Sequence, residues 1–335
     1  MKQFLKILSL VVVVMMACSL LIQSAEAQCK YQHEKKIIMG FSQIGAESAW
    51  RAANTDSIKA EAEKRKDCFE LKFSDAQQKQ ENQIKAIRSF IAQGVDVIAF
   101  SPVVESGWEP VLQEAKKAGI PVILSDRAVD VQDESLWVTF MGSDFVEEGR
   151  RSAKWLVENY EKVKREDKSM DEVNIVELVG TVGSAPANDR YEGFREVLKD
   201  YPNFKILATQ SADFTRAGGK QVMEAFLKAH GDKIDVVYGH NDDSALGAIQ
   251  AIEEAGFKPG KDIIIVSIDA VRGAFEAMVE GKLNCTVECS PLLGPQMFDA
   301  AEDLMQGKKI PRRIVTQEGV FPMEVAEEVL PTRKY

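Results

Sequence analysis

The alternation of short apolar runs with amphipathic stretches constrains the fold of this 335-residue chain more than any other feature. Residues 95–100 form an apolar run of strand length, and in residues 80–93 the apolar Ile84, Ile87 and Ile91 recur at helical spacing. Strands that alternate with helices in this way predict parallel sheets covered by helices on both faces. Two such series of similar length therefore predict an α/β protein with two doubly wound parallel-sheet domains.

The expected strands and helices alternate along the chain. Strands are predicted at residues 36–41, 69–73, 95–100, 121–124, 136–141, 173–179, 204–209, 234–238, 263–268 and 284–289. Helices are predicted at residues 50–66, 80–93, 108–118, 145–160, 187–199, 215–229, 243–255 and 271–280. Residues 142–144 are the natural crossing between the domains. Residues 291–335 are too few for a third domain. A helix and strands from this segment can complete the two sheets, so the chain can cross between the domains more than once.

The first 27 residues have the pattern of a secretory signal peptide. A short basic start precedes an apolar stretch over residues 5–22, and an Ala-x-Ala pattern for signal peptidase ends at Ala27. We therefore expect an exported protein of the periplasm whose mature chain begins at Gln28. A lipid tether at Cys18 is the alternative, because the residues before it faintly resemble a lipoprotein cleavage box.

Export places the four remaining cysteines in an oxidising compartment, where disulfides form. Cys29 and Cys68 precede the first two expected strands. If those strands are parallel neighbours, both cysteines lie at the same edge of the sheet, which favours a Cys29–Cys68 disulfide. Cys285 and Cys289 lie four residues apart in an expected strand, which separates them by about 13 Å. That distance is too long for a bridge, so we expect two small buried side chains.

Charge and motif content argue against several function classes. The chain has 42 Lys and Arg against 52 Asp and Glu, and its net charge of −10 disfavours nucleic acid as a partner. The stretch from Gly40 to Gly45 resembles a nucleophile elbow, but Ile44 stands where that motif needs glycine. No Gly-rich dinucleotide or Walker sequence occurs, and the three histidines are scattered. We therefore expect no catalytic residue, no metal and no cofactor.

Polar and aromatic side chains gather just after the expected strands, where ligands bind in open parallel sheets. These residues are Glu47, Trp50, Arg51, Asp126 and Arg127 in the first half and Asn188, Asp189, Arg190, Asp213, Phe214, His240, Asn241, Asp242, Asp243 and Asp269 in the second half. Carboxylate, amide and guanidinium groups bond vicinal hydroxyls two at a time. Aromatic faces cover the C–H patches of a sugar ring. A cleft with both kinds of group and no nucleophile favours capture of a carbohydrate over its turnover.

The chain resembles the ribose and galactose type of periplasmic binding proteins, the exported sugar-binding proteins of bacterial ABC importers. The resemblance covers essentially the whole mature chain. Its marks are Gly40-Phe41-Ser42-Gln43, Asp126-Arg127 after residues 120–124, Arg190 before Gly193-Phe194, Asp213-Phe214-Thr215-Arg216, Asn241-Asp242-Asp243 and Ser267-Ile268-Asp269. Within the family the chain is most similar to the galactofuranose-binding members. That closer match is carried by residues 45–51, 77–83 and 106–110.

The resemblance implies a type I periplasmic binding protein whose two lobes meet at a three-crossover hinge near Ser143, Ser290 and Glu318. Its implied divisions are a signal peptide over 1–27, an N-terminal lobe over 28–143 and 291–318, and a C-terminal lobe over 144–290 and 319–335. The implied ligand is a galactofuranose-like monosaccharide. It would be held by Trp50, Arg51, Asp126 and Arg127 of the first lobe, with Glu47 as a further member, and by Arg190, Phe214, Asn241 and Asp269 of the second. The implied partners are an ABC permease and its ATPase, and we expect a monomer.

Two departures from the ribose binders put exact specificity in doubt. The pair Trp50-Arg51 stands where those proteins typically place two phenylalanines, so ribose is not the expected sugar. Cys289 stands near the position at which they carry a glutamine, and a thiol cannot replace an amide.

Other interpretations of the sequence stay open. An exported sensor that presents its sugar-bound state to a chemoreceptor or sensor kinase would have the same binding core. A hydrolase on this fold would need a nucleophile or a metal, and the related repressors begin with a DNA-reading helix where this chain has its signal peptide. Single residues also have structural alternatives. Asp126-Arg127 could be a surface ion pair, Asn241 a helix N-cap and Trp50 a core anchor.

Overall fold

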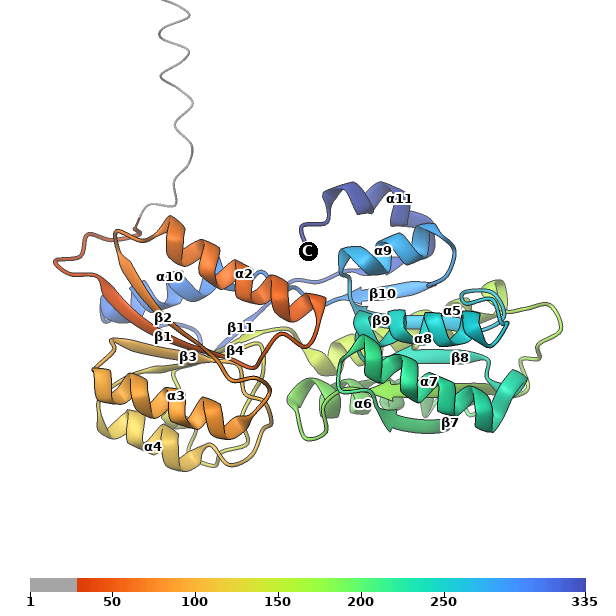
Figure 1. Cartoon of the computed structure of the whole chain (residues 1–335), viewed down its shortest axis with the longest axis horizontal. Helices are drawn as coiled ribbons and strands as arrows, with labels where there is room; N and C mark the ends of the chain where they lie inside the picture. Colours follow the sequence, from red (N-terminus) through yellow and green to blue (C-terminus); the bar gives the residue numbers. More distant parts are fainter. Residues whose placement is uncertain (1–28) are drawn as a thin grey trace, which may run out of the picture.

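The computed structural model of the protein describes residues 29–335. The predicted signal peptide over 1–27 and the alternative tether at Cys18 lie outside these residues. Within them, no helix combines the length and the apolar composition that a membrane crossing requires. The described chain forms two lobes, each built on a six-stranded sheet (Figure 1).

The first sheet has the strand order β11-β5-β4-β3-β1-β2, and all of its pairings are parallel. Its strands are β1 (Ile37–Gln43), β2 (Phe69–Asp75), β3 (Val97–Phe100), β4 (Val122–Ser125), β5 (Thr139–Gly142) and β11 (Arg313–Val315). The helices that cover it are α2 (Ala49–Lys64), α3 (Gln80–Gln93), α4 (Glu109–Lys117) and α10 (Gly294–Met305).

The central strand β3 shows why its sequence is a continuous apolar run. Successive side chains of a strand point to opposite faces of the sheet. Val97 and Ala99 pack into the core that includes Ile58 of α2, whereas Ile98 and Phe100 pack into the core on the other face. Both faces are covered, so every residue of the strand is buried and apolar.

The second sheet has the strand order β12-β10-β9-β8-β6-β7. Its strands are β6 (Val173–Val179), β7 (Phe204–Ser211), β8 (Val236–Gly239), β9 (Ile264–Asp269), β10 (Cys285–Glu288) and β12 (Val320–Pro322). Its helices are α5 (Phe145–Val163), α6 (Ala185–Leu198), α7 (Arg216–His230), α8 (Asp242–Glu254), α9 (Arg272–Val279) and the short α11 (Ala326–Val329). Pairings are parallel except between β10 and the edge strand β12, which is antiparallel. The predicted α/β fold of two doubly wound sheets is confirmed.

Two local predictions were wrong. The strand expected from residue 136 begins only at Thr139, because Leu136 closes a 3-10 turn that the Asp133 side chain caps by accepting a bond from the Ser135 N–H. The strand expected to reach residue 289 ends at Glu288. The short helix α11, which packs near α9, was not predicted at all.

Three crossovers join the lobes. One follows β5, one follows β10 on the way to α10, and one connects β11 with β12. A single oxygen touches all three, because Glu318 Oε1 accepts bonds from Ser143 Oγ at 2.5 Å, from the Ser290 N–H at 2.9 Å and from Thr316 Oγ1 at 2.7 Å. The crossovers therefore meet at one polar contact.

Cys29 and Cys68 form a disulfide, with their Cα atoms 5.9 Å apart. They precede β1 and β2, which are parallel neighbours with Ile37 paired to Phe69. Cys285 and Cys289 are buried and unbridged.

We predict that replacing both Cys29 and Cys68 by Ser lowers the free energy of unfolding by about 2–4 kcal/mol, because the bridge closes a long loop in the unfolded chain. Urea unfolding of wild type and variant, each with and without reductant, measures this. Reductant should shift the midpoint of the wild type and leave that of the variant unchanged. A wild-type midpoint that does not respond to reductant would contradict the prediction.

Candidate functional site

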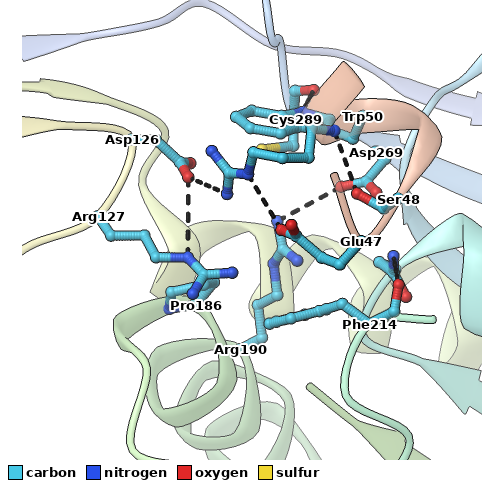
Figure 2. Close-up of a pocket in the computed structure, with 12 residues that line it drawn as sticks. Glu47, Ser48, Trp50, Asp126, Arg127, Pro186, Arg190, Phe214, Asp269 and Cys289 are labelled. Carbon is cyan, nitrogen blue, oxygen red and sulfur yellow. Dashed lines mark hydrogen bonds and ion pairs between the residues drawn. The ribbon is translucent and has the colours of Figure 1, made fainter. Parts of the chain in front are cut away.

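A narrow cavity lies between the two lobes (Figure 2). Its lining residues are Glu47, Ser48, Trp50, Arg51, Asp126, Arg127, Pro186, Arg190, Phe214, Asn241, Asp269 and Cys289. All nine residues that the family resemblance implied are among them. The other residues noted after the strands do not line the cavity; they are Asn188, Asp189, Asp213, His240, Asp242 and Asp243. Ser48 and Pro186 were missed, and Cys289 was noted only as a departure from the ribose binders. Ser48 and Pro186 each lie at the start of a helix, and the sequence reasoning looked only for charged, amide and aromatic groups.

The lining side chains come from the carboxyl ends of the strands and from the helices that follow. Asp126 and Arg127 come directly after β4, and Asp269 is the last residue of β9. Asn241 caps the N-terminus of α8, and Phe214 precedes α7. Since parallel strands end at one edge of their sheet, residues far apart in sequence converge there.

Two glycines shape the backbone around these side chains. Asp126 and Phe214 have φ values of 65° and 60°, in the left-handed region that non-glycine residues seldom adopt. A Cβ on Gly180 would lie 1.9 Å from Cζ of Phe214, so only glycine leaves room for that ring. A Cβ on Gly142 would lie 3.0 Å from Cα of Asp126, which shows how closely β5 approaches the turn. Conformations of this kind cluster at binding sites.

Arg51 is the centre of the first-lobe half. Its Nη2 donates to Asp126 Oδ2 at 2.7 Å and its Nε donates to Glu47 Oε1 at 3.0 Å. Burial lowers the pKa of Arg51, but Asp126 and Glu47 outweigh that effect and hold the pKa above its ordinary value. The guanidinium is therefore a fixed cation between two fixed carboxylates.

Arg127 lies beside this pair and is buried too. Burial, followed by the repulsion of Arg51, lowers the pKa of Arg127 to about 10, so it stays a cation at neutral pH. Its Nη1 donates to the Val103 carbonyl at 3.0 Å, while its Nε has no hydrogen-bond partner and lies 3.8 Å from Asp126 Oδ2. Since this ion pair is buried, the surface ion pair considered for Asp126-Arg127 is wrong.

Arg190 is the matching centre of the second-lobe half. Its Nε donates to Glu148 Oε2 at 2.7 Å and its Nη1 to the His240 carbonyl at 2.6 Å, while Nη2 lies 3.7 Å from Asp269 Oδ1. Burial, above all, raises the pKa of Asp269 well above its ordinary value. The second lobe thus presents one guanidinium between two carboxyl groups, as the first lobe does.

Asn241 caps a helix, which was the structural alternative for this residue, and it also lines the cavity. Its Oδ1 accepts from the Ser244 N–H and hydroxyl, as an N-cap does, and its Nδ2 donates to the Phe214 carbonyl at 3.0 Å. An amide NH₂ has two hydrogens, so one of them remains for a ligand.

Direct contacts close the lobes around the cavity. Trp50 Nε1 of the first lobe donates to the Cys289 carbonyl at 2.6 Å, and the indole is buried. At the rim, the Ala49 N–H donates to Asp243 Oδ2 at 2.6 Å, and Asn188 Nδ2 donates to Glu105 Oε2 at 2.6 Å. The Trp50 side chain therefore contacts the other lobe directly, and the same residue also lines the cavity.

The described cavity residues offer donors and acceptors but no activated nucleophile. Burial raises the pKa of the Cys289 thiol well above its ordinary value, so the thiolate that would react does not form at neutral pH. The Ser48 hydroxyl accepts the Arg51 N–H as a helix cap. Behind the cavity, carboxylate oxygens of Glu148 and Glu318 and the Cys289 sulfur lie within 4.8 Å of one another, the one such group of three metal-ligating atoms in residues 29–335.

The sequence and the structure are similar to those of known proteins. The family model of the periplasmic binding protein domain matches residues 39–309. The galactofuranose-binding protein YtfQ of Escherichia coli (strain K12) is 49% identical over 301 residues, which are 89% of this chain and 92% of that protein.

Two solved structures share the fold closely. One is a protein from Mycobacterium smegmatis in complex with β-D-fucofuranose, with 54% identity and a TM-score of 0.84, covering 89% of this chain and 95% of that one. The other is the periplasmic binding protein component of the arabinose ABC transporter from Shewanella sp. ANA-3, bound to α- and β-L-arabinofuranose. It has 50% identity and a TM-score of 0.83, with the same coverage of both chains. The chain therefore belongs to the periplasmic binding protein family.

Proposed function

We propose that this protein captures a neutral monosaccharide in its furanose form, of the galactofuranose type, and delivers it to an ABC import permease. The observation that carries the proposal is the cavity between the lobes, which is lined from both sides by paired guanidinium and carboxyl groups.

Charge balance in the cavity favours a neutral ligand. The lining has three guanidinium groups, on Arg51, Arg127 and Arg190, and three carboxyl groups, on Glu47, Asp126 and Asp269. A sugar phosphate or sugar acid would add a buried charge to a lining with equal numbers of guanidinium and carboxyl groups, which is costly. Hydroxyl groups can both donate and accept, so a neutral polyol matches donors and acceptors that alternate around the cavity.

Two buried polar atoms support a hydroxyl-rich ligand. Glu47 Oε2 and Arg127 Nε have no hydrogen-bond partner among the described residues, although both are shielded from solvent. Buried polar groups are nearly always paired, so these two atoms favour a ligand that supplies a donor to one and an acceptor to the other. The rings of Trp50 and Phe214 can contact the apolar patches of the same sugar.

The furanose form is favoured by the relatives named above, which bind galactofuranose, fucofuranose and arabinofuranose by name. Delivery to an importer is favoured by the arabinose relative, which is a component of an ABC transporter. We place the protein in the periplasm as a monomer without enzymatic activity. The N-terminal lobe would be residues 28–143 and 291–318, and the C-terminal lobe residues 144–290 and 319–335. The sensor alternative has no feature of the described structure in its favour.

We predict that Asp126→Asn weakens sugar binding about tenfold or more, which corresponds to ~1.4 kcal/mol. The amide keeps the shape of the side chain but loses the charge that holds Arg51 and accepts a ligand hydroxyl. Calorimetry with D-galactose, D-fucose and L-arabinose measures this, and Asp130→Asn, on an exposed neighbouring carboxylate, is the control. Equal affinities for wild type and Asp126→Asn would contradict the assignment of Asp126 to the site.

We also predict that the sugar closes the cleft. Ligand groups come from both lobes, so a sugar can bond all of them only in the closed form, and binding shifts the population toward it. Small-angle scattering should show a smaller radius of gyration with saturating sugar than without. Arg190→Met should lose both binding and closure, whereas Lys199→Met, which removes an exposed cation at the end of α6, should keep both. Equal radii in the two states of the wild type would show that the lobes do not close.

A further inference from the structure

A chain of buried polar groups runs from the cavity to the hinge. It starts at Arg190, which lines the cavity, and passes to Glu148 on α5, which does not. The Glu148 side chain is only 1% exposed. Its Oε2 accepts from Arg190 Nε at 2.7 Å, while its Oε1 has no hydrogen-bond partner among the described residues. This second oxygen is shielded from water, and the Cys289 thiol is the group that lies close enough to interact with the Glu148 carboxyl group.

We use the name hinge cluster for Ser143, Cys289 and Glu318. Ser143 Oγ lies 3.2 Å from Cys289 Sγ and 2.5 Å from Glu318 Oε1. A Glu148 oxygen lies within 4.8 Å of the sulfur and of a Glu318 oxygen. Since Glu318 also accepts bonds from the other crossovers, Glu148 stands between the sugar site and the point where the lobes are joined.

Carboxyl groups outnumber cations around Glu148. The titratable and charged groups that face it are Arg190 of α6, Tyr238 of β8, Asp269 of β9, Cys289 after β10 and Glu318 of the third crossover. Arg151 and Arg313 reach the crossovers as well, but they donate to backbone carbonyls of Glu318 and Ser143. One fully buried guanidinium therefore serves three carboxyl groups, so two of the three must carry a proton for the charges to balance.

Burial, which outweighs the attraction of Arg190, raises the pKa of Glu148 to about 8, and Glu318 adds to the rise. The pKa values of the Cys289 thiol and the Tyr238 phenol are also raised well above their ordinary values. Neither group therefore loses its proton between pH 7 and 9. Burial also raises the pKa values of Asp269 and Glu318, so Glu148 shares the protons of this cluster with two neighbouring carboxyl groups.

We propose that Glu148 is a positioning residue for the sugar site: Oε2 holds Arg190 toward the cavity, while a proton on Oε1 lets the carboxyl group lie against the hinge cluster. Sugar capture is then linked to one buried proton. This inference rests on the proposed function, because the proton acts on the closed form that the sugar selects.

The sign of the pH dependence follows from the closed form. When the cleft opens, Glu148 gains water and its pKa moves toward its ordinary value, so the raised pKa belongs to the closed form. A carboxyl group whose pKa is raised in the closed form stabilises that form fully at pH values below its ordinary pKa. This stabilisation is lost as the pH rises through about 8. For one proton, sugar affinity should fall about tenfold between pH 7 and pH 9.

Calorimetry of D-galactose, D-fucose and L-arabinose binding at pH 7 and pH 9 tests the proposal. Wild type should lose about tenfold in affinity, whereas Glu148→Gln should change less than twofold. Its amide mimics the protonated carboxyl, with an acceptor for Arg190 and a donor toward the hinge cluster. Glu147→Gln, on the partly exposed neighbour of Glu148, should keep the wild-type pH dependence. Glu148→Ala should bind the sugars weakly at both pH values. Restored binding in Glu148→Gln would show that Glu148 acts by positioning Arg190 and not only by stabilising the fold.

A second readout is taken on the sugar-saturated protein, which is in the closed form. Its infrared band of protonated carboxyl groups should weaken from pH 7 to pH 9 in wild type and should change less in Glu148→Gln. An unchanged pH dependence of binding in Glu148→Gln, or the same loss of the carboxyl band in wild type and Glu148→Gln, would overturn the role of Glu148. If none of the sugars binds wild type at either pH, the proposed function fails instead.

Discussion

The structure depends on buried pairs of guanidinium and carboxyl groups at the carboxyl ends of its two sheets. An isolated charge in a protein interior is costly, and a paired one is tolerated when its remaining hydrogen bonds are made. Arg51 meets that condition through Asp126 and Glu47 without any ligand, and Arg190 does so through Glu148 and the His240 carbonyl. The binding groups are therefore held in place before a sugar arrives, which lowers the entropy cost of binding.

The same pairs explain how local binding can become a signal between domains. Arg51 lies on α2 of the first lobe and Arg190 on α6 of the second (Figure 1). The crossovers between the lobes meet at Glu318. A few residues of this kind can absorb the rotation of a hinge. A permease that contacts both lobes could then distinguish loaded from empty protein by the spacing of the two surfaces.

The strand–helix rhythm was sufficient to predict the fold, because the period of apolar residues is a local property of the sequence. The candidate site was predicted for a related reason: in a parallel sheet, a residue that follows a strand lies at the edge where ligands bind. Sequence alone could not find Glu148 or Gly180, since their roles depend on contacts with Arg190 and Phe214, 42 and 34 residues away. The role of Glu318 likewise depends on Ser143, 175 residues distant. No periodic pattern links such pairs, so they become visible only in three dimensions.

The central claim is that the cavity holds one neutral sugar in furanose form and leaves it unchanged. Calorimetry with two analogues of D-galactose tests it most directly: 5-deoxy-D-galactose cannot close a pyranose ring, and 4-deoxy-D-galactose cannot close a furanose ring. We expect one molecule of the 5-deoxy sugar to bind per protein and to be recovered intact, while the 4-deoxy sugar binds at least tenfold more weakly. Tighter binding of the 4-deoxy sugar, or conversion of either sugar into a new compound, would contradict the account.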